Sequence, residues 1–310
     1  MHSFETESSH SGFFFLYKPV GMTSFDIVKR IHSSLGKSRK VGHTGTLDRM
    51  AEGLLVIPFG DYTCFSQIFL QKEKTYFSEV EFGVSTDSTD VDGEVLETWE
   101  ETRVLDFLEN LGGLDQMRKE FLKVQETRFQ IPPLISATKV QGQRSSDLFR
   151  KGVMASKPPK PIQIYSLELV EMTTKGFSFR TCVTGGAYIR GIVADFSKTL
   201  GLPMHITKLV REKVGDLHVR DSDKAEQIFE KSLRVKNLEM VYPLQEVVLD
   251  PKDSEFLRNG GYPPIEFDNM PEVYAITTSG ERIAWLGKNP PTHHLPYKIK
   301  KVFSFKKSFS

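Results

Sequence analysis

The sequence predicts an α+β protein rather than a doubly wound α/β protein. Some segments place apolar residues at every second position, which is typical of strands, and others at every third or fourth, which is typical of helices. The two kinds of segment do not alternate strictly along the chain, as a parallel sheet with crossover helices would require. At 310 residues, the chain has room for one large domain and one small domain.

The first segments predict a strand and a helix. GFFFLYKPVG (12–21) is mostly apolar as far as Pro19, so we expect a strand that ends there in a turn. Apolar residues then recur at helical spacing after Ser24, which can serve as the N-cap, and Gly36 ends the helix.

A basic loop with two glycines separates these elements from a second strand. This loop (37–48) leads into GLLVIPFG (53–60), an apolar run that predicts a buried strand, and then into a helix over 61–74. In 75–84 the period changes to two, which predicts another strand, and STDSTDVDG (85–93) is its turn-rich exit.

The middle of the chain predicts helical segments followed by strands. Helical spacing covers 101–125, and the pair Pro132–Pro133 then interrupts regular structure. Beyond the prolines we expect, in order, a short strand in ISATKV, a basic amphipathic segment, strands over 161–172 and 176–186, a helix over 187–201, and a loop, helical turn and strand over 202–219.

The character of the sequence changes near residue 250, which predicts a second domain. A short helix and several small strands, with turn signals at GG, SG and GK, are expected in the rest of the chain. We therefore expect a main domain over 13–250 and a small β-rich domain over 251–310. Residues 1–12 are polar and partly acidic, and we expect them to form a disordered leader.

The composition predicts a soluble cytoplasmic protein. Hydrophobic residues make up 39% and charged residues 26%, and the longest apolar runs are far shorter than a membrane span of roughly 20 residues. The N-terminus has the composition of neither a secretory signal nor a transit peptide. The two cysteines, Cys64 and Cys182, are far apart and fit a reducing compartment.

The charge is unevenly placed, although the net charge is only +1. Residues 29–49 carry six bases and one acid, 71–110 carry twelve acids and three bases, and 117–160 carry ten bases and three acids. Separate basic patches suit a polyanion that several elements contact. Each patch alone could equally be solvated surface, so composition leaves both readings open.

The stretch VGHTGTLDRMAEGLLVIPFG (41–60) concentrates residues that carry chemistry. It lacks the GK[ST] of a phosphate-binding P-loop and the GxGxxG of a dinucleotide site. His43 and Asp48 are too few for a metal site, which needs three or four ligands, and no activated serine motif occurs. We therefore predict no metal. Asp48 remains as a helix-capping residue or as a carboxylate nucleophile.

A carboxylate nucleophile needs no base to activate it, because it is already deprotonated at neutral pH. A cation beside it keeps it charged in a pocket that excludes water. Arg190 in GAYIRG, at a strand–helix junction two residues after Tyr188, could supply that cation. Taken by itself, Arg190 could equally be a surface arginine.

VGHTGTLDRMAEGLLVIPFG resembles the catalytic motif of the TruB-type tRNA pseudouridine synthases, in their bacterial stand-alone form. Five further segments match the family in the right order, which makes the resemblance specific over about 13–220. They are FLYKPVGMTSFDIV, KTYFSEVEFGVSTDSTDVDGEV, QIPPLISATKVQGQR, CVTGGAYIRGIVADFSKTLG and HITKLVRE. The resemblance implies the pseudouridine synthase fold, with a long, mixed, mostly antiparallel sheet flanked by helices. Residues 251–310 resemble the family's PUA-like C-terminal domain more faintly.

The resemblance implies roles for residues around one target nucleotide. Asp48 would be the nucleophile, Arg190 its partner, and Tyr76 would pack on the target base and is a candidate for proton removal. Tyr188 would hold the flipped nucleotide, and His43 would sit where the base leaves its stack. Three residues would support them: Leu209 lining the pocket, Asp90 orienting Arg190, and Lys18 beside the site.

The resemblance also implies an RNA-binding surface and some differences from the family. A thumb-like segment (126–153) would grip the RNA. The expected RNA contacts are Lys37, Arg39, Lys40, Lys139, Arg144 and Arg211. The departures are Arg49 for a usual Pro, Glu52 for a common Thr, Ile135 for an aromatic residue, and Val210 for a basic residue.

The implied activity is isomerisation of uridine 55 in the T-loop of tRNA to pseudouridine. No atoms enter or leave and no redox step occurs, so we predict no cofactor. We expect a monomer that needs no protein partner and does not act at a membrane. Asp48 could attack C6 of uracil or C1′ of ribose, and the sequence leaves this open. Two rivals remain: a tRNA-binding or folding chaperone, and the catalytic subunit of a guide-RNA-dependent synthase.

Overall fold

The computed structural model describes residues 11–36, 38–133, 139–140, 143–144, 158–230, 232–265, 270–290, 292–295 and 297–303. Most of the predicted leader and of the thumb-like segment lies outside these residues. In the described part, eight strands form one mixed sheet in the order β10-β11-β3-β12-β2-β1-β14, with β13 paired to β12. The strands are β1 (Gly12–Lys18), β2 (Glu52–Phe59), β3 (Lys74–Phe82), β10 (Ile164–Met172), β11 (Gly176–Val183), β12 (Met204–Val214), β13 (Leu217–His218) and β14 (Asp223–Lys224).

The sheet is mostly antiparallel, as predicted, and its two halves meet at one short parallel pairing. Five of its seven strand pairings are antiparallel, and only β1–β14 and β12–β2 are parallel. The β12–β2 pairing joins Val210 to Glu52 and Arg211 to Gly53. Gly53 has φ +107°, and a Cβ there would lie 2.4 Å from the Arg211 carbonyl oxygen. Glycine is therefore required where these strands approach.

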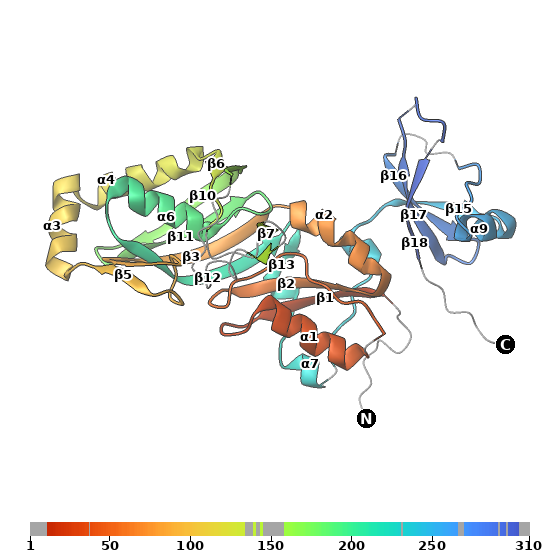
Figure 1. Ribbon diagram of the computed structural model, residues 1–310, viewed down its shortest axis with the longest axis horizontal. Helices are drawn as coiled ribbons and strands as arrows, with labels where there is room; N and C mark the ends of the chain where they lie inside the picture. Colours follow the sequence, from red (N-terminus) through yellow and green to blue (C-terminus); the bar gives the residue numbers. More distant parts are fainter. Residues whose placement is uncertain are drawn as a thin grey trace.

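Helices cover the two halves of the sheet separately (Figure 1). Helices α3, α4 and α6 pack on the half formed by β10, β11, β3 and β12, around Phe121, Phe177 and Phe196. Helices α1 and α7 pack against β1 and β2 around Phe14 and Ile27. The helices are α1 (Ser24–Leu35), α2 (Ser66–Gln71), α3 (Glu101–Leu111), α4 (Gly113–Leu122), α6 (Ile189–Leu200), α7 (Gln227–Glu230), α8 (Leu238–Val241) and α9 (Pro251–Arg258).

Both faces of β1 and β2 are buried, which explains their continuous apolar runs. Phe14 and Leu55 face the core under α1, whereas Phe13 and Leu54 face a second core shared with the C-terminal sheet. Shorter strands complete the fold: β4 (Val84–Thr86), β5 (Val95–Thr98), β6 (Phe129–Gln130), β7 (Lys139–Val140), β8 (Gln143–Arg144) and β9 (Lys160–Pro161).

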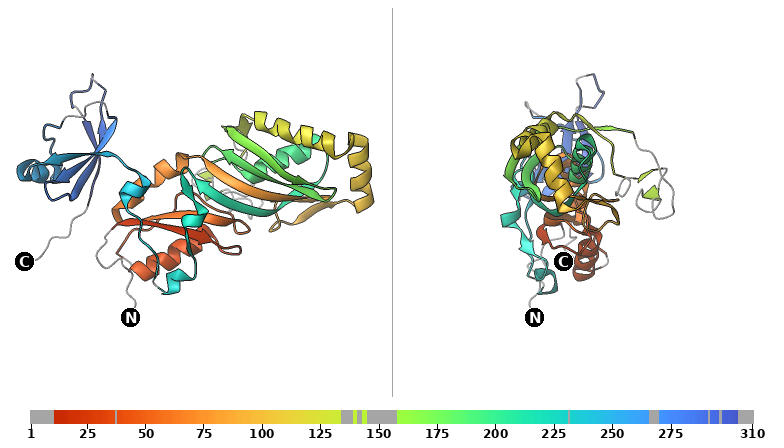
Figure 2. Two further views of the ribbon diagram at one scale, coloured as in Figure 1. Left: turned by 180° about the vertical axis from the view of Figure 1, so that it is seen from behind. Right: turned by 90° about the vertical axis from the view of Figure 1, so that its left-hand side faces the viewer.

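The C-terminal sheet has the order β15-β16-β17-β18 and lies at the end of the molecule opposite α3 (Figure 2). Its strands are β15 (Gln245–Leu249), β16 (Glu272–Thr277), β17 (Arg282–Lys288) and β18 (Tyr297–Val302). Stacking of Trp285 on Phe65, with ring centroids 4.8 Å apart, and a 2.6 Å ion pair between Lys301 and Asp61 join it to the main sheet. Because β15 precedes residue 251, the sheet begins before the predicted boundary.

Several predicted elements differ in detail. The N-cap of α1 is Thr23 rather than Ser24, because Thr23 and Asp26 form a reciprocal capping box. The predicted helix over 101–125 breaks at Gly112, which has a left-handed conformation. The predicted loop and helical turn in 202–219 are wrong, because β12 is one continuous strand held by β3. None of the described helices is long and apolar enough to cross a membrane.

Replacing Gly53 with alanine should lower the free energy of unfolding by about 3 kcal/mol, because a left-handed conformation and a clash with β12 add together. Gly113→Ala is the matched control: φ is +77°, and nothing lies within 4 Å of the added Cβ. The control should lose about 1 kcal/mol. Urea denaturation of both variants measures the difference, and equal losses would contradict the close approach of β2 to β12.

Candidate active site

Asp48 lies in the loop between α1 and β2, and its neighbours fix its position. The backbone N–H of Leu47 donates to Ser24 Oγ at 2.8 Å, and the N–H of Thr44 donates to the Val56 carbonyl at 3.1 Å. Leu47 and Thr44 are buried, whereas the Asp48 side chain is 37% exposed. The loop therefore holds one carboxylate at the surface of a rigid scaffold instead of using it as a helix cap.

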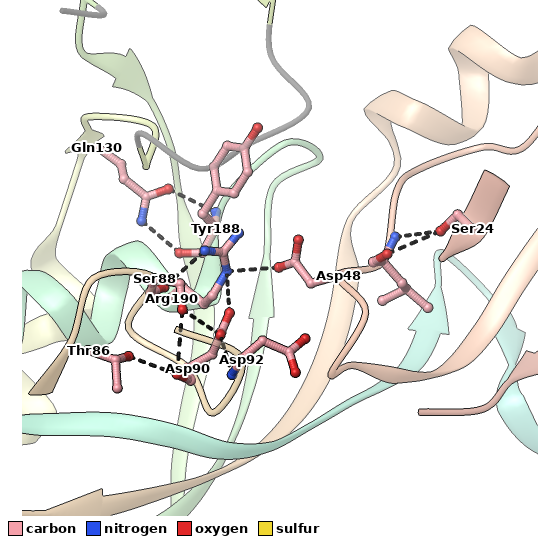
Figure 3. A network of polar contacts seen from close by, with 10 residues as sticks. Ser24, Asp48, Thr86, Ser88, Asp90, Asp92, Gln130, Tyr188 and Arg190 are labelled. Carbon is pink, nitrogen blue, oxygen red and sulfur yellow. Dashed lines mark hydrogen bonds and ion pairs between the residues drawn. The ribbon is translucent and has the colours of Figure 1, made fainter. Parts of the chain in front are cut away.

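Arg190, the second residue of α6, lies opposite Asp48 (Figure 3). Its Nε donates to Asp48 Oδ2 at 2.8 Å and is 3.3 Å from Asp90 Oδ2, while Nη1 donates to the Ser88 carbonyl at 2.9 Å. The Arg190 side chain is only 3% exposed. A buried guanidinium requires such partners, so the arginine is not a surface residue.

Asp90 is the second carboxylate beside Arg190, and its own loop holds it. Oδ1 accepts hydrogen bonds from Ser88 Oγ at 2.6 Å and from the Asp92 N–H at 3.0 Å. Burial raises the pKa of Asp90, against the opposing effects of the Ser88 hydrogen bond and Arg190. The neighbouring Thr89 has φ +62°, which is uncommon for a residue other than glycine. The Ile206 N–H in β12 donates to the Thr89 carbonyl at 3.0 Å and stabilises this conformation.

A cavity of about 310 Å³ opens beside the Asp48–Arg190 pair. Tyr76 of β3, Leu209 of β12 and Tyr188 at the start of α6 supply its apolar and aromatic walls. Asp48 Oδ1, the oxygen that Arg190 does not hold, has no hydrogen-bond partner among the residues described. The cavity therefore combines surfaces for an aromatic ring with one carboxylate oxygen available for chemistry.

Lys18 and His43 lie near the cavity but do not line it. Lys18 is fully buried, and its Nζ donates to the carbonyls of Pro19 and Met22 and lies 3.5 Å from that of Arg49. Burial lowers the pKa of Lys18 to about 8. His43 is half-buried, and its Nδ1 accepts the Gly45 N–H at 3.3 Å. Lys18 thus supports the loop that carries Asp48.

The predicted RNA contacts fall into different places. Arg39 and Lys40 lie on the loop before Asp48, and Lys40 is exposed. Lys139 and Arg144 are opposite each other in the backbone register of strands β7 and β8, whereas Lys37 lies outside the described residues. Arg211 is only 1% exposed and lies in the cavity wall, where Nε donates to the Leu54 carbonyl and Nη2 to that of Gly45. Arg211 could therefore meet only a group that enters the cavity.

The four departures from the family pattern are not equivalent in position. Arg49 is exposed next to Asp48, and Ile135 lies outside the described residues. Glu52 and Val210 are directly opposite each other in the β2–β12 pairing. These two departures therefore belong to the junction of the two half-sheets.

Lys74, at the start of β3, is a site residue that the sequence analysis missed. Its side chain lines the cavity, and the residue is 4% exposed. Nζ donates to the carbonyls of Phe69, Leu70 and Lys72 at 2.6–2.7 Å, so it satisfies the C-terminal end of α2. Burial, and then the neighbouring Arg211, lower the pKa of Lys74 to about 7.

Gln130 and Ser88 were not predicted either, because each makes a bond between a side chain and the backbone of a distant segment. Gln130 bonds the backbone of Tyr188, and the Ser88 carbonyl accepts from Arg190. The only sequence signal was their place in segments that resemble the family. Among the residues described, no cluster of three or more His, Cys, Asp and Glu side chains could hold a metal ion.

The buried Lys74 predicts a pH-dependent stability. Its ordinary pKa of 10.5 applies to the unfolded chain, so between pH 7 and 10.5 the unfolded state binds more protons and stability rises with pH. Relative to Lys74→Met, the wild type should gain about 2 kcal/mol of unfolding free energy between pH 7 and 9, and nothing below pH 6. Urea titrations of both proteins across this range measure the difference, and parallel curves would contradict the prediction.

Comparisons with known proteins place this chain in a family. Residues 32–189 match the model of the TruB family pseudouridylate synthase (N terminal domain). The tRNA pseudouridine synthase B of Leptospira interrogans (serovar copenhageni) is 37% identical over 296 residues, which is 95% of each chain. The protein of that name from Aquifex aeolicus is 38% identical over 212 residues, covering 68% of this chain and 70% of the relative.

Solved structures support the same fold. The archaeal box H/ACA sRNP Nop10-Cbf5 complex contains a chain that matches with a TM-score of 0.62 and 19% identity, covering 97% of this chain and 88% of that one. At this identity the likeness concerns the fold alone, and it confirms the predicted pseudouridine synthase fold. The family match and the curated relatives, which cover most of the chain, confirm the enzyme class predicted from the sequence, an isomerase. The chain belongs to the TruB family of pseudouridylate synthases.

Proposed function

We propose that this enzyme isomerises uridine 55 in the T-loop of tRNA to pseudouridine, with Asp48 as the nucleophile. The observation that carries the proposal is the Asp48–Arg190 pair beside a cavity walled by Tyr76, Tyr188 and Leu209. The tRNA substrate is supported by the relatives named tRNA pseudouridine synthase B.

The reaction itself rearranges one nucleotide. The C1′–N1 bond breaks, the uracil turns, and a C1′–C5 bond forms, while C5 loses a proton and N1 gains one. The target base must first leave its stack, at a cost of a few kcal/mol. Stacking on an aromatic side chain offsets about 1–3 kcal/mol per base, and Tyr76 and Tyr188 offer such surfaces. Tyr76 also carries a hydroxyl that could take part in removing the C5 proton.

Asp48 can act through Oδ1 while Arg190 holds Oδ2 in place. Either C6 of the uracil or C1′ of the ribose can be the atom attacked. A carboxylate held by a buried guanidinium is oriented before the substrate arrives, which removes part of the entropic cost of the step. His43, on the same loop, would fill the gap that the flipped base leaves.

The proposal includes a two-part architecture and an independent, cytoplasmic enzyme. Residues 13–250 would form the catalytic domain, residues 126–153 would grip the RNA, and residues 251–310 would form an appended RNA-binding domain. The relatives at 37–38% identity, which are named tRNA pseudouridine synthase B, favour this stand-alone form over a guide-RNA-dependent subunit. The 19% identity to a chain of the Nop10-Cbf5 complex supports a shared fold and not a guide-dependent role. We propose that it acts as a monomer without a protein partner.

Asp48→Asn should lower the rate of pseudouridine formation by at least about 10⁴-fold, because the amide is not a nucleophile. The measurement uses purified protein and a synthetic T-arm RNA, with pseudouridine read by carbodiimide labelling and primer extension. Asp106→Asn, the same change at an exposed position on α3, is the matched control and should keep wild-type activity.

The outcomes separate the proposal from its rivals. Modification by the wild type and by Asp106→Asn, but not by Asp48→Asn, that is lost when cytidine replaces uridine 55, establishes the reaction, its site and the nucleophile. Tight RNA binding without modification by any protein would sink the enzyme assignment on this substrate and favour a chaperone or a guide-dependent subunit. Equal activity of Asp48→Asn would remove Asp48 as the nucleophile.

A further inference from the structure

We propose that Gln130 is a positioning residue for this reaction: it fixes the first turn of α6 and thereby places Arg190 against Asp48. The inference rests on the proposed function and deepens it. The Gln130 side-chain amide is buried and makes two hydrogen bonds to the backbone of one residue of the site, Tyr188.

Gln130 is 3% exposed and bonds both backbone groups of Tyr188 (Figure 3). Its Nε2 donates to the Tyr188 carbonyl at 2.8 Å, and its Oε1 accepts the Tyr188 N–H at 2.8 Å. One side chain thus pairs with a residue 58 positions away as a neighbouring strand would. Two such bonds fix the orientation of that backbone as well as its position.

The backbone of Tyr188 is the point from which α6 begins. Tyr188 is the N-cap of α6 and has no side-chain hydrogen bond that caps the helix. Its carbonyl accepts the first helical hydrogen bond, from the Ile192 N–H at 3.2 Å, as well as that from Gln130. Arg190 follows two residues later, so the Gln130 amide sets the direction in which the guanidinium leaves the helix.

Gly191 leaves the space that the Gln130 amide occupies. A Cβ on Gly191 would lie 2.6 Å from Nε2 and 2.9 Å from Cδ of Gln130. Alanine would otherwise be preferred over glycine inside a helix. The helix therefore carries glycine, a residue less favourable than alanine, next to Arg190. The side-chain amide of Gln130 fills the space that the missing Cβ leaves.

Gln130 itself is held by elements other than α6. It pairs with Lys160 between β6 and β9, and the Ile162 N–H donates to the Arg128 carbonyl at 2.9 Å. Lys160 in turn lines the cavity. The Gln130 amide is therefore a fixed reference against which the start of α6 is set, and a misplacement of about 1 Å can cost about 10²-fold in rate.

The test is Gln130→Glu, which keeps the shape and the acceptor but sets a carboxylate oxygen against the Tyr188 carbonyl. Gln125→Glu, the same change at a partly exposed position with a weak 3.5 Å bond, is the matched control. For each protein we would measure the single-turnover rate on T-arm RNA, the Kd for that RNA, and hydrogen exchange at the Tyr188 and Ile192 amides, whose N–H groups bond Gln130 and the Tyr188 carbonyl. Gln130→Glu should be about 10- to 100-fold slower, with Kd within about twofold and faster exchange at both amides.

Gly191→Ala provides a second variant if Gln130→Glu does not fold. It displaces the same amide from the other side and should slow the reaction similarly, while Gly191→Ala combined with Gln130→Ala should be no slower than Gln130→Ala alone. An unchanged rate despite faster exchange would show a merely structural contact and overturn the proposal. A Kd that rises by the same factor as the rate falls would also overturn it, because the variant would then act on RNA binding. An inactive wild type would overturn the proposed function instead.

Discussion

The ion pair between Asp48 and Arg190 is the interaction around which the site is arranged. A guanidinium that is 3% exposed is stable only with good partners, and it has them in Asp48, Asp90 and the Ser88 carbonyl. These partners come from two loops that are far apart in sequence, and the arginine comes from a helix. Because the buried guanidinium takes its partners from both loops, the loops and α6 must keep their relative positions for all three contacts to form.

The sheet provides those positions through one short junction. The β2–β12 pairing brings the loop before β2 next to the strand that carries Leu209 and Arg211, and Gly53 allows the close approach. Arg211 then bonds the carbonyls of Leu54 and Gly45, so a second buried guanidinium fastens the Asp48 loop to the junction. Lys18 and Lys74 add similar bonds to loop and helix-end carbonyls. The cavity thus lies among elements that buried cations hold together.

Much of this fold could be predicted from local patterns. The apolar runs at 12–18 and 53–59 gave two strands because each has both faces buried, and Gly36 and Gly201 ended helices where expected. Prediction failed where tertiary pairing decides the outcome. A loop and a helical turn were expected before the strand in 202–219, but pairing with β3 keeps Met204–Val214 extended.

The pairing of Asp48 with Arg190 could be predicted from the sequence, whereas the groups that hold the pair in place could not. Asp48 and Arg190 carry recognisable chemistry, and the family resemblance linked them across 142 positions. Gln130 and Lys74 bond backbone groups, and the Ser88 carbonyl is itself a backbone group that accepts from Arg190. No spacing in the sequence shows which backbone group a side chain will reach. The family resemblance led to Arg211 being expected among the RNA contacts, yet its bonds to two carbonyls place it in the cavity wall.

The most direct test of this account is the single-turnover rate of Arg190→Lys on T-arm RNA. Lysine keeps the positive charge but cannot reach Asp48, Asp90 and the Ser88 carbonyl together. The account predicts a loss of at least about 10²-fold with the RNA affinity retained, because Asp48 would lose its orientation. A rate close to that of the wild type would contradict the claim that this ion pair positions the nucleophile.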